Sequence, residues 1–274
     1  MKKSLFLAAL VAAFVACSVD DDPQAEYEVT FALPQFQVTT EAMHAPAALI
    51  DDDSQSMTDL YLFDGKTLVS HQTSSDENFG TITALLSAGE HSLHFIATRA
   101  LGLNYIAESG ALMMTSVRPT FGKHLTFNVN GSSTNNIELT RVSAQIAITI
   151  EDVIPSNAAN LRFQFNRYCT ALYVESFDGY VGESFDQTVN LSGKVGTADN
   201  TWRLIYISES YADGMNSNYT ITATTSNGTV IGQATGTVPI KANTKTLLHG
   251  NLFSGTKSVL SISTAWNADI DVDM

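Results

Sequence analysis

The sequence predicts an all-β protein, and three observations lead to that expectation. β-Branched and aromatic residues recur in short alternating runs, clusters of Gly, Asn, Asp and Ser separate those runs, and sustained helical periodicity is scarce. This combination is typical of β-sandwiches and barrels. The chain has 274 residues, which is enough for one large or two modest domains with real cores.

The first residues have the features of an export signal. Lys2 and Lys3 precede an uninterrupted apolar run at residues 5–16, and Cys17 follows Ala16. A basic start, an apolar run of about 7–15 residues and a small residue before the cut characterise secretory signal peptides. The run is too short to cross a bilayer as a helix, which needs about 20 residues. We expect a signal peptide at 1–16, cut between Ala16 and Cys17.

A cysteine at the cleavage position makes this segment resemble a bacterial lipoprotein signal. The resemblance implies that Cys17 carries acyl chains and holds the protein on the outer membrane. Asp20, Asp21 and Asp22 follow and resemble a surface-export signal of Bacteroidetes lipoproteins, within an acidic tether at 17–26. The alternative is an ordinary secreted protein in which Cys17 is incidental.

Charge excludes several classes of partner. Loss of residues 1–16 leaves 258 residues and takes the formal net charge from −14 to −16, because two lysines leave with the signal. A chain this acidic will not bind nucleic acid, where Lys and Arg supply the affinity. Membrane attachment would depend on the acyl chains. Cys169 has no second cysteine for a disulfide in the mature chain, and we expect it to be buried in a core.

Alternating runs predict the strands of two domains, at 27–138 and 139–274, each a sandwich or a barrel. In the first domain we expect strands at 27–33, 60–63, 67–72, 81–86, 91–98 and 125–129, with a short helix at 103–114. From the boundary onwards we expect strands at 136–141, 142–150, 161–165, 170–174, 187–191, 202–207, 219–225, 229–239, 246–253 and 259–263.

The sequence offers no catalytic motif. The nucleophile elbow, the zinc protease helix, the phosphate loop and the dinucleotide fingerprint are all missing. The closest histidines, His91 and His94, lie an odd number of positions apart in one expected strand, on opposite faces, so they cannot share a metal ion. The acidic run Asp51–53 has no calcium-loop pattern. We therefore expect neither an enzyme nor a cofactor or metal site.

The large aromatic residues leave one binding hypothesis open. Trp202 shares a strand face with Leu204 and Tyr206, which favours a core or rim position over sugar stacking. Trp266 follows the last expected strand and precedes an alternating acidic tail at 267–273. That tail is either an edge strand whose charges prevent pairing with other chains or a segment that pairs with a neighbouring subunit.

Several stretches together resemble Bacteroidetes fimbrillins. They are residues 94–99 (HFIATR), 139–148 (LTRVSAQIAI), 239–253 (PIKANTKTLLHGNLF) and 260–266 (LSISTAW). The resemblance implies two tandem transthyretin-like β-sandwiches, cell adhesion, and assembly with other fimbrial subunits by strand donation. In that process, an added strand gains affinity from backbone hydrogen bonds and specificity from alternate side chains.

The family's shaft subunits lose their first strand to an arginine-directed protease, and this sequence departs from that pattern. Neither Lys nor Arg occurs between Lys3 and Lys66, and the first arginine, Arg99, ends an expected strand. We therefore expect an anchor or accessory subunit of the fimbrium that keeps its first strand. A proteolytically matured shaft subunit remains an alternative. A surface lipoprotein that binds a host or glycan ligand through Trp202, Tyr206 or Trp266 is another.

Overall fold

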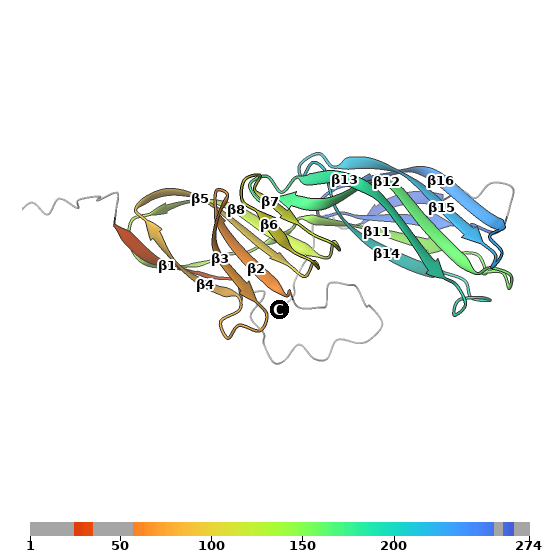
Figure 1. Cartoon of the computed structure of the whole chain (residues 1–274), viewed down its shortest axis with the longest axis horizontal. Coiled ribbons are helices and arrows are strands. Elements are labelled where there is room, and N and C mark those ends of the chain that lie inside the picture. Colours follow the sequence, from red (N-terminus) through yellow and green to blue (C-terminus); the bar gives the residue numbers. More distant parts are fainter. Residues whose placement is uncertain (1–24, 35–56, 255–259, 266–274) are drawn as a thin grey trace, which may run out of the picture.

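The computed structural model describes residues 25–34, 57–254 and 260–265. Within these ranges the chain forms eighteen β-strands and no α-helix, which confirms the predicted all-β class. The strands form two sandwich-like lobes that follow one another along the long axis of the molecule (Figure 1).

The first lobe pairs a three-stranded sheet, in the order β4-β1-β9, with a five-stranded sheet, in the order β10-β8-β5-β2-β3. The strands are β1 (Glu26–Ala32), β2 (Asp59–Asp64), β3 (Thr67–Thr73), β4 (Thr81–Ser87), β5 (Gly89–Thr98), β8 (Thr120–Val129), β9 (Ser133–Asn136) and β10 (Thr140–Arg141). Alternate apolar side chains of both sheets meet in one buried cluster that contains Phe31, Leu62 and Phe95.

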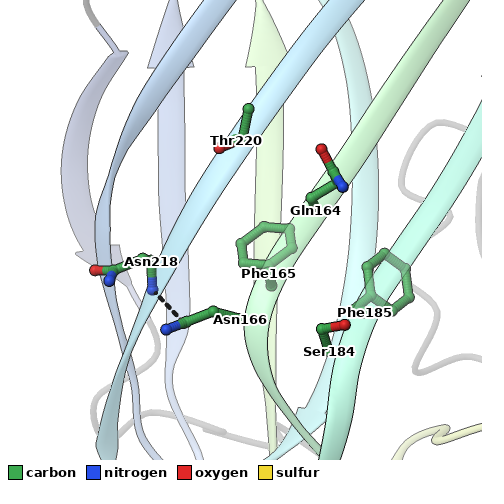
Figure 2. A pocket seen from close by; sticks show the side chains of 7 residues that line it. All are labelled: Gln164, Phe165, Asn166, Ser184, Phe185, Asn218 and Thr220. Carbon is green, nitrogen blue, oxygen red and sulfur yellow. Dashed lines mark hydrogen bonds between the residues drawn. The ribbon is translucent and has the colours of Figure 1, made fainter.

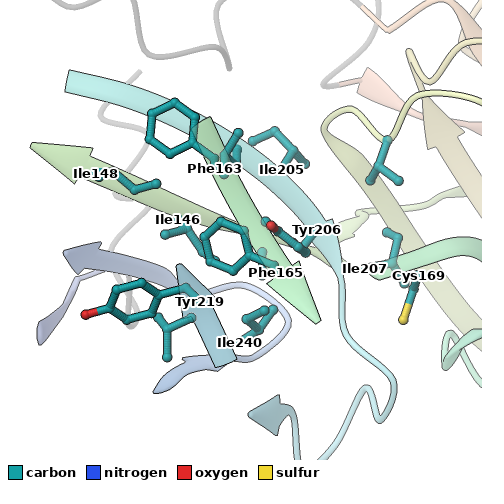
Figure 3. Packing of buried hydrophobic residues seen from close by; sticks show 14 of the residues in the cluster. Ile146, Ile148, Phe163, Phe165, Cys169, Ile205, Tyr206, Ile207, Tyr219 and Ile240 are labelled. Carbon is teal, nitrogen blue, oxygen red and sulfur yellow. The ribbon is translucent and has the colours of Figure 1, made fainter. Parts of the chain in front are cut away.

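The second lobe has a four-stranded sheet, β14-β11-β17-β18, and a larger sheet, β16-β15-β12-β7-β6, in which β13 also pairs with β12. The strands are β6 (Asn104–Ile106), β7 (Ala111–Met113), β11 (Ser143–Ile150), β12 (Asn160–Tyr173), β13 (Gly179–Asn190), β14 (Asn200–Ile207), β15 (Met215–Thr224), β16 (Val230–Ile240), β17 (Lys245–Gly250) and β18 (Leu260–Ala265). Ile146, Phe163 and Tyr206 lie in its core (Figure 3).

The helix predicted at 103–114 was wrong, because this segment is the β6–β7 hairpin. Gly110 takes a positive φ of 69° at the turn, which favours glycine. β7 then pairs antiparallel with residues 171–173 of β12, which buries Leu112. This long-range strand pairing overrides the local helical pattern. As a result, a hairpin from the first half of the chain extends a sheet of the second lobe.

Three further strand boundaries differ from expectation. The runs at 161–165 and 170–174 form one strand, β12, which continues through an irregular register after Phe165. The stretch at 136–141 does not form one strand, because β9 ends at Asn136 and β10 covers only residues 140–141. β17 ends at Gly250, where the backbone N–H groups of residues 252–254 turn to the carboxylate of Asp152.

The two lobes share packed side chains. Tyr61, Phe63 and Ile96 lie on the face of the five-stranded sheet opposite the first lobe's own core, and they belong to the same buried cluster as the second lobe's core. Phe63 also contacts Tyr105 of β6, with ring centroids 4.7 Å apart. The lobes are therefore joined by an apolar contact.

Candidate functional site: the first strand and the chain's sheet edges

β1 is the central strand of the three-stranded sheet. It pairs antiparallel with β4 over residues 26–32 and parallel with β9 over residues 29–32. β9 has four polar residues, and β1 is its ladder partner in the described part of the chain. The sheet therefore depends on β1 for its continuity.

Alternation along β1 places its apolar side chains in the first core. Val29, Phe31 and Leu33 are fully buried, whereas Glu28 and Thr30 lie on the other face. The Phe31 ring meets Phe95 and Phe127 edge to face, with centroids 5.1 and 5.5 Å away. Burial of three such side chains stabilises the lobe by about 5–9 kcal/mol.

Without β1, the structure would contain a groove with a defined chemistry. Its walls would be the freed backbone edges of β4 and β9, and its floor would be the side chains that now contact Val29, Phe31 and Leu33. Unpaired edges of this kind are templates for another strand. A replacement strand would need apolar residues at alternate positions, as in β-augmentation.

Basic residues are poorly placed for the removal of β1. The first lysine or arginine after Lys3 is Lys66, in the tight turn between β2 and β3. Arg99 directly follows β5 and is only 7% exposed, so its peptide bond lies in a packed region. A trypsin-like protease would therefore cut beyond β2 at its earliest, inside the five-stranded sheet.

β18 differs from β1 in the exposure of its described side chains, at residues 260–262. It pairs antiparallel with β17 at the border of the four-stranded sheet. Leu260 is half-buried, and Ile262, directly opposite the buried Leu248, is still 43% exposed. None of the described side chains of β18, at residues 260–262, is buried, whereas Val29, Phe31 and Leu33 at β1 are.

Several predicted site residues lie outside the described residues. These are Ala16 and Cys17 at the expected cleavage and lipid site, Asp20, Asp21 and Asp22, the acidic run at 51–53, and Trp266 with its acidic tail. The tether expected at 17–26 is described only for its last two residues, of which Glu26 already belongs to β1. The expectations for these residues remain predictions.

The structure places the two aromatic candidates for sugar stacking in the core. Tyr206 is fully buried among Phe165, Phe185 and Tyr168. Trp202 is half-buried against Phe163, and the Lys194 ammonium covers its ring at 5.3 Å. The core or rim position predicted for Trp202 is confirmed. The Tyr206 ring is therefore closed to a ligand, whereas Trp202 lies at the rim between Phe163 and Lys194.

The histidines in the described part of the chain lie in strands, with one contact that sequence reasoning missed. His91 bonds to Asp64 and to the Ser87 carbonyl, and His94 lies on the other face of β5. There it meets His124 directly across the ladder. In the described ranges no group of three or more His, Cys, Asp or Glu side chains could hold a metal ion.

Cys169 is fully buried, as predicted. Burial raises the pKa of its thiol to about 11, so the reactive thiolate is scarce at neutral pH. Gly179 lies so close that a Cβ there would come within 2.7 Å of Sγ. The thiol is a packing group of the second core.

One shallow pocket of about 270 Å³ lies on the larger sheet of the second lobe (Figure 2). It opens where β12 leaves β15: the ladder ends at Phe165 and Tyr219, and Asn166 accepts hydrogen bonds from Ser217 Oγ and the Asn218 N–H. Its lining is Gln164, Phe165, Asn166, Ser184, Phe185, Asn218 and Thr220. None of these side chains ionises near neutral pH, so the lining of this pocket includes no general acid or base.

The geometry thus defines a class: an all-β protein of two sandwich-like lobes. No protein-family model and no curated protein matches the sequence. Among solved structures, a candidate adhesin from Bacteroides ovatus is 8% identical, covers 86% of this chain and 88% of its own, and has a TM-score of 0.51. That match shows a shared fold over most of both chains, as the fimbrillin resemblance implied.

Two further solved structures match with TM-scores below 0.5. One is a candidate adhesin from Bacteroides thetaiotaomicron, 10% identical, covering 89% of this chain and 98% of its own, with a TM-score of 0.48. The other is the fimbrial anchor protein Mfa2 from Porphyromonas gingivalis, 11% identical, covering 88% and 98%, with a TM-score of 0.44. No helix in the described ranges is long and apolar enough to span a membrane.

Proposed function

We propose that this protein is a lipid-anchored subunit of a cell-surface fimbrium, in an anchor or accessory position. It joins neighbouring subunits by exchange of β-strands and catalyses no reaction. The observation that carries the proposal is the first strand, which lies buried between β4 and β9 and has no lysine or arginine between Lys3 and Lys66 at which a basic-residue protease could release it. The fold shared with a Bacteroides adhesin supports the same class.

The arrangement suits a mechanical role at the membrane. Acyl chains on Cys17 would fix the N-terminal end, close to β1, while β1 keeps its own groove filled. A subunit whose groove is filled cannot accept a strand there, so polymer growth would continue from another edge. β18 is the strand we assign to the neighbour, since it borders its sheet and its described apolar side chains, Leu260 and Ile262, are not buried.

N-terminal mass spectrometry of the protein from its native surface tests this assignment. We expect an acylated Cys17 and peptides that cover β1. A mature start after residue 33 would make the protein a processed shaft subunit. A mature N-terminus at residue 17 that carries no acyl chains would contradict the proposed membrane anchor.

The same cells test the fimbrial role. Electron microscopy of a strain that lacks the protein should show shed, lengthened or missing fimbriae, whereas a Cys17→Ala strain should release them into the medium. Unchanged fimbriae in both strains would contradict the proposal. The structure does not favour the glycan-binding alternative through Trp202 or Tyr206, because Tyr206 is fully buried and the Trp202 ring is half-buried with the Lys194 ammonium over it.

A further inference from the structure

One part of the larger sheet of the second lobe carries very little charge. It is built from β13, β12, β15 and β16, over residues 184–190, 160–166, 216–224 and 230–240. The charged residues within these stretches are Arg162 and Asp186, and they neutralise each other, because Arg162 Nε donates to Asp186 Oδ1 at 2.8 Å. The whole chain has 28 acidic and 14 basic residues. This surface therefore offers no attraction to an ion, unlike most of an acidic protein.

Amides and hydroxyls cover the outer face of these strands instead. Alternation turns Phe163, Phe165 and Ile221 into the core, and the intervening side chains lie outside. Gln164 and Thr220 are direct partners across the β12–β15 ladder, and Thr220 is in turn opposite Thr235 of β16. The outer, uncharged side chains are Gln164, Asn166, Ser184, Asn218, Thr220, Thr222, Gln233, Thr235 and Thr237.

A β-bulge opens the pocket of about 270 Å³ in this face (Figure 2). The β12–β13 register runs from Phe165 opposite Phe185 to Tyr168 opposite residue 183, so two residues of β12 face Ser184 alone. Bulges of this kind interrupt the ladder and redirect side chains. The half-buried Phe185 lines the opening with Phe165 and supplies an aromatic ring beside the polar groups.

Hydrogen bonds within the protein fix the three amides that line the pocket. Asn166 Oδ1 accepts the Asn218 N–H at 2.7 Å, and Asn218 Oδ1 accepts the Thr237 hydroxyl at 2.7 Å. Gln164 Nε2 donates to Asp186 at 3.2 Å. The other ends of these amides, namely the NH₂ groups of both asparagines and the Gln164 oxygen, have no protein partner among the described residues. The pocket therefore presents oriented donors and an acceptor together.

We propose that this pocket binds one ring of a neutral polysaccharide, whose chain continues over the amide and hydroxyl face of β15 and β16. Sugar hydroxyls both donate and accept, which matches the free amide groups and the hydroxyls of Ser184 and Thr220. The C–H face of a sugar ring packs on an aromatic ring, which Phe185 provides. A volume of about 270 Å³ is small for a ligand pocket, so it suits a single ring. This binding activity goes beyond the fimbrial role and does not depend on strand exchange.

A single site of this kind should bind weakly. The pocket is shallow and its asparagines are exposed, so we expect a Kd of about 1 mM for one sugar ring. Many copies on one surface would bind a repeating polysaccharide far more tightly, because each further contact is intramolecular. The assay must therefore display the protein in many copies first and measure the single site afterwards.

An array of neutral, sialylated and sulfated glycans, probed with the full-length protein coupled to beads, tests the proposal. We expect signals from neutral glycans, and saturation-transfer NMR with the strongest of them should show direct contact. Thr220→Arg places a long cationic side chain in the pocket and should abolish binding. Asn218→Ala removes one free donor and should weaken binding about fivefold. The matched control is Thr201→Arg, at an exposed threonine of β14 in the other sheet, which should bind as the wild type.

Four results would overturn the proposal. These are no signal from any neutral glycan, signals from acidic glycans alone, binding retained by Thr220→Arg, and equal loss in Thr201→Arg. Thermal unfolding must show that each variant is folded, and Ser184→Arg, at an exposed position of β13, replaces Thr220→Arg if that protein does not fold. Self-association in sedimentation that Thr220→Arg removes, without glycan binding, would instead make this face a contact between copies. Fimbriae of a Thr220→Arg strain should look normal by electron microscopy, which separates this test from that of the fimbrial role.

Discussion

Replacement of Phe31 by alanine should lower the free energy of unfolding of the first lobe by about 4 kcal/mol. The substitution leaves a cavity in the buried cluster, for which Phe→Ala costs are about 3–5 kcal/mol. It also removes the two edge-to-face contacts with Phe95 and Phe127. With a typical urea dependence of about 2 kcal/mol per molar, the midpoint should fall by about 2 M.

Urea-dependent hydrogen exchange followed by mass spectrometry can measure this lobe separately, through peptides that cover β4 and β5. Thr30→Ala is the matched control, since Thr30 lies on the opposite face of the same strand and its hydroxyl meets Thr83 in an exposed contact. We expect a change within about 0.5 kcal/mol there. Equal, small effects of both substitutions would refute the inference that β1 is an integral part of the first core.

Three other substitutions or treatments probe the second lobe. Tyr206→Phe should leave stability unchanged or raise it by up to about 1 kcal/mol in thermal unfolding, because the buried hydroxyl has no hydrogen-bond partner; a clear loss would reveal a partner for that oxygen. Native Cys169 should resist alkylation at pH 8 and react only in denaturant, since it is buried and its pKa is about 11; rapid native labelling would disprove its core role. Asp152→Ala should cost about 1–3 kcal/mol, because three backbone N–H groups lose their acceptor, and Asp152→Asn should restore part of that loss.

The sequence located most strands but misjudged places where the local pattern was ambiguous. The stretch at 103–114 contains apolar residues at helical spacing, yet it forms β6 and β7, because β12 provides a ladder partner that local periodicity cannot reveal. The two runs at 161–165 and 170–174 became one strand because an irregular register carries β12 through Asn166 and Arg167. In both cases a distant strand decided the outcome.

The candidate site was predictable in part. The spacing of apolar residues identified β1 as a strand with one buried face, and the absence of Lys and Arg before Lys66 argued against its removal. The sequence also placed His91 and His94 on opposite faces. It could not place His94 opposite His124, because the register between β5 and β8 depends on how both strands share one core.

The sequence alone determined the all-β class and the buried face of strands such as β1, because side chains alternate by local geometry whichever strand is the neighbour, and it predicted the burial of Cys169. That β11 is buried on both faces, Gln145 and Ala147 included, came only from the packing of the sheets. Only the tertiary structure decided that β1 lies between β4 and β9, that β6–β7 extends a sheet of the second lobe, and that Phe177 stacks on His124. Those pairings join residues distant in the chain, and they form where shared burial of apolar surface exceeds what each local segment gains by itself.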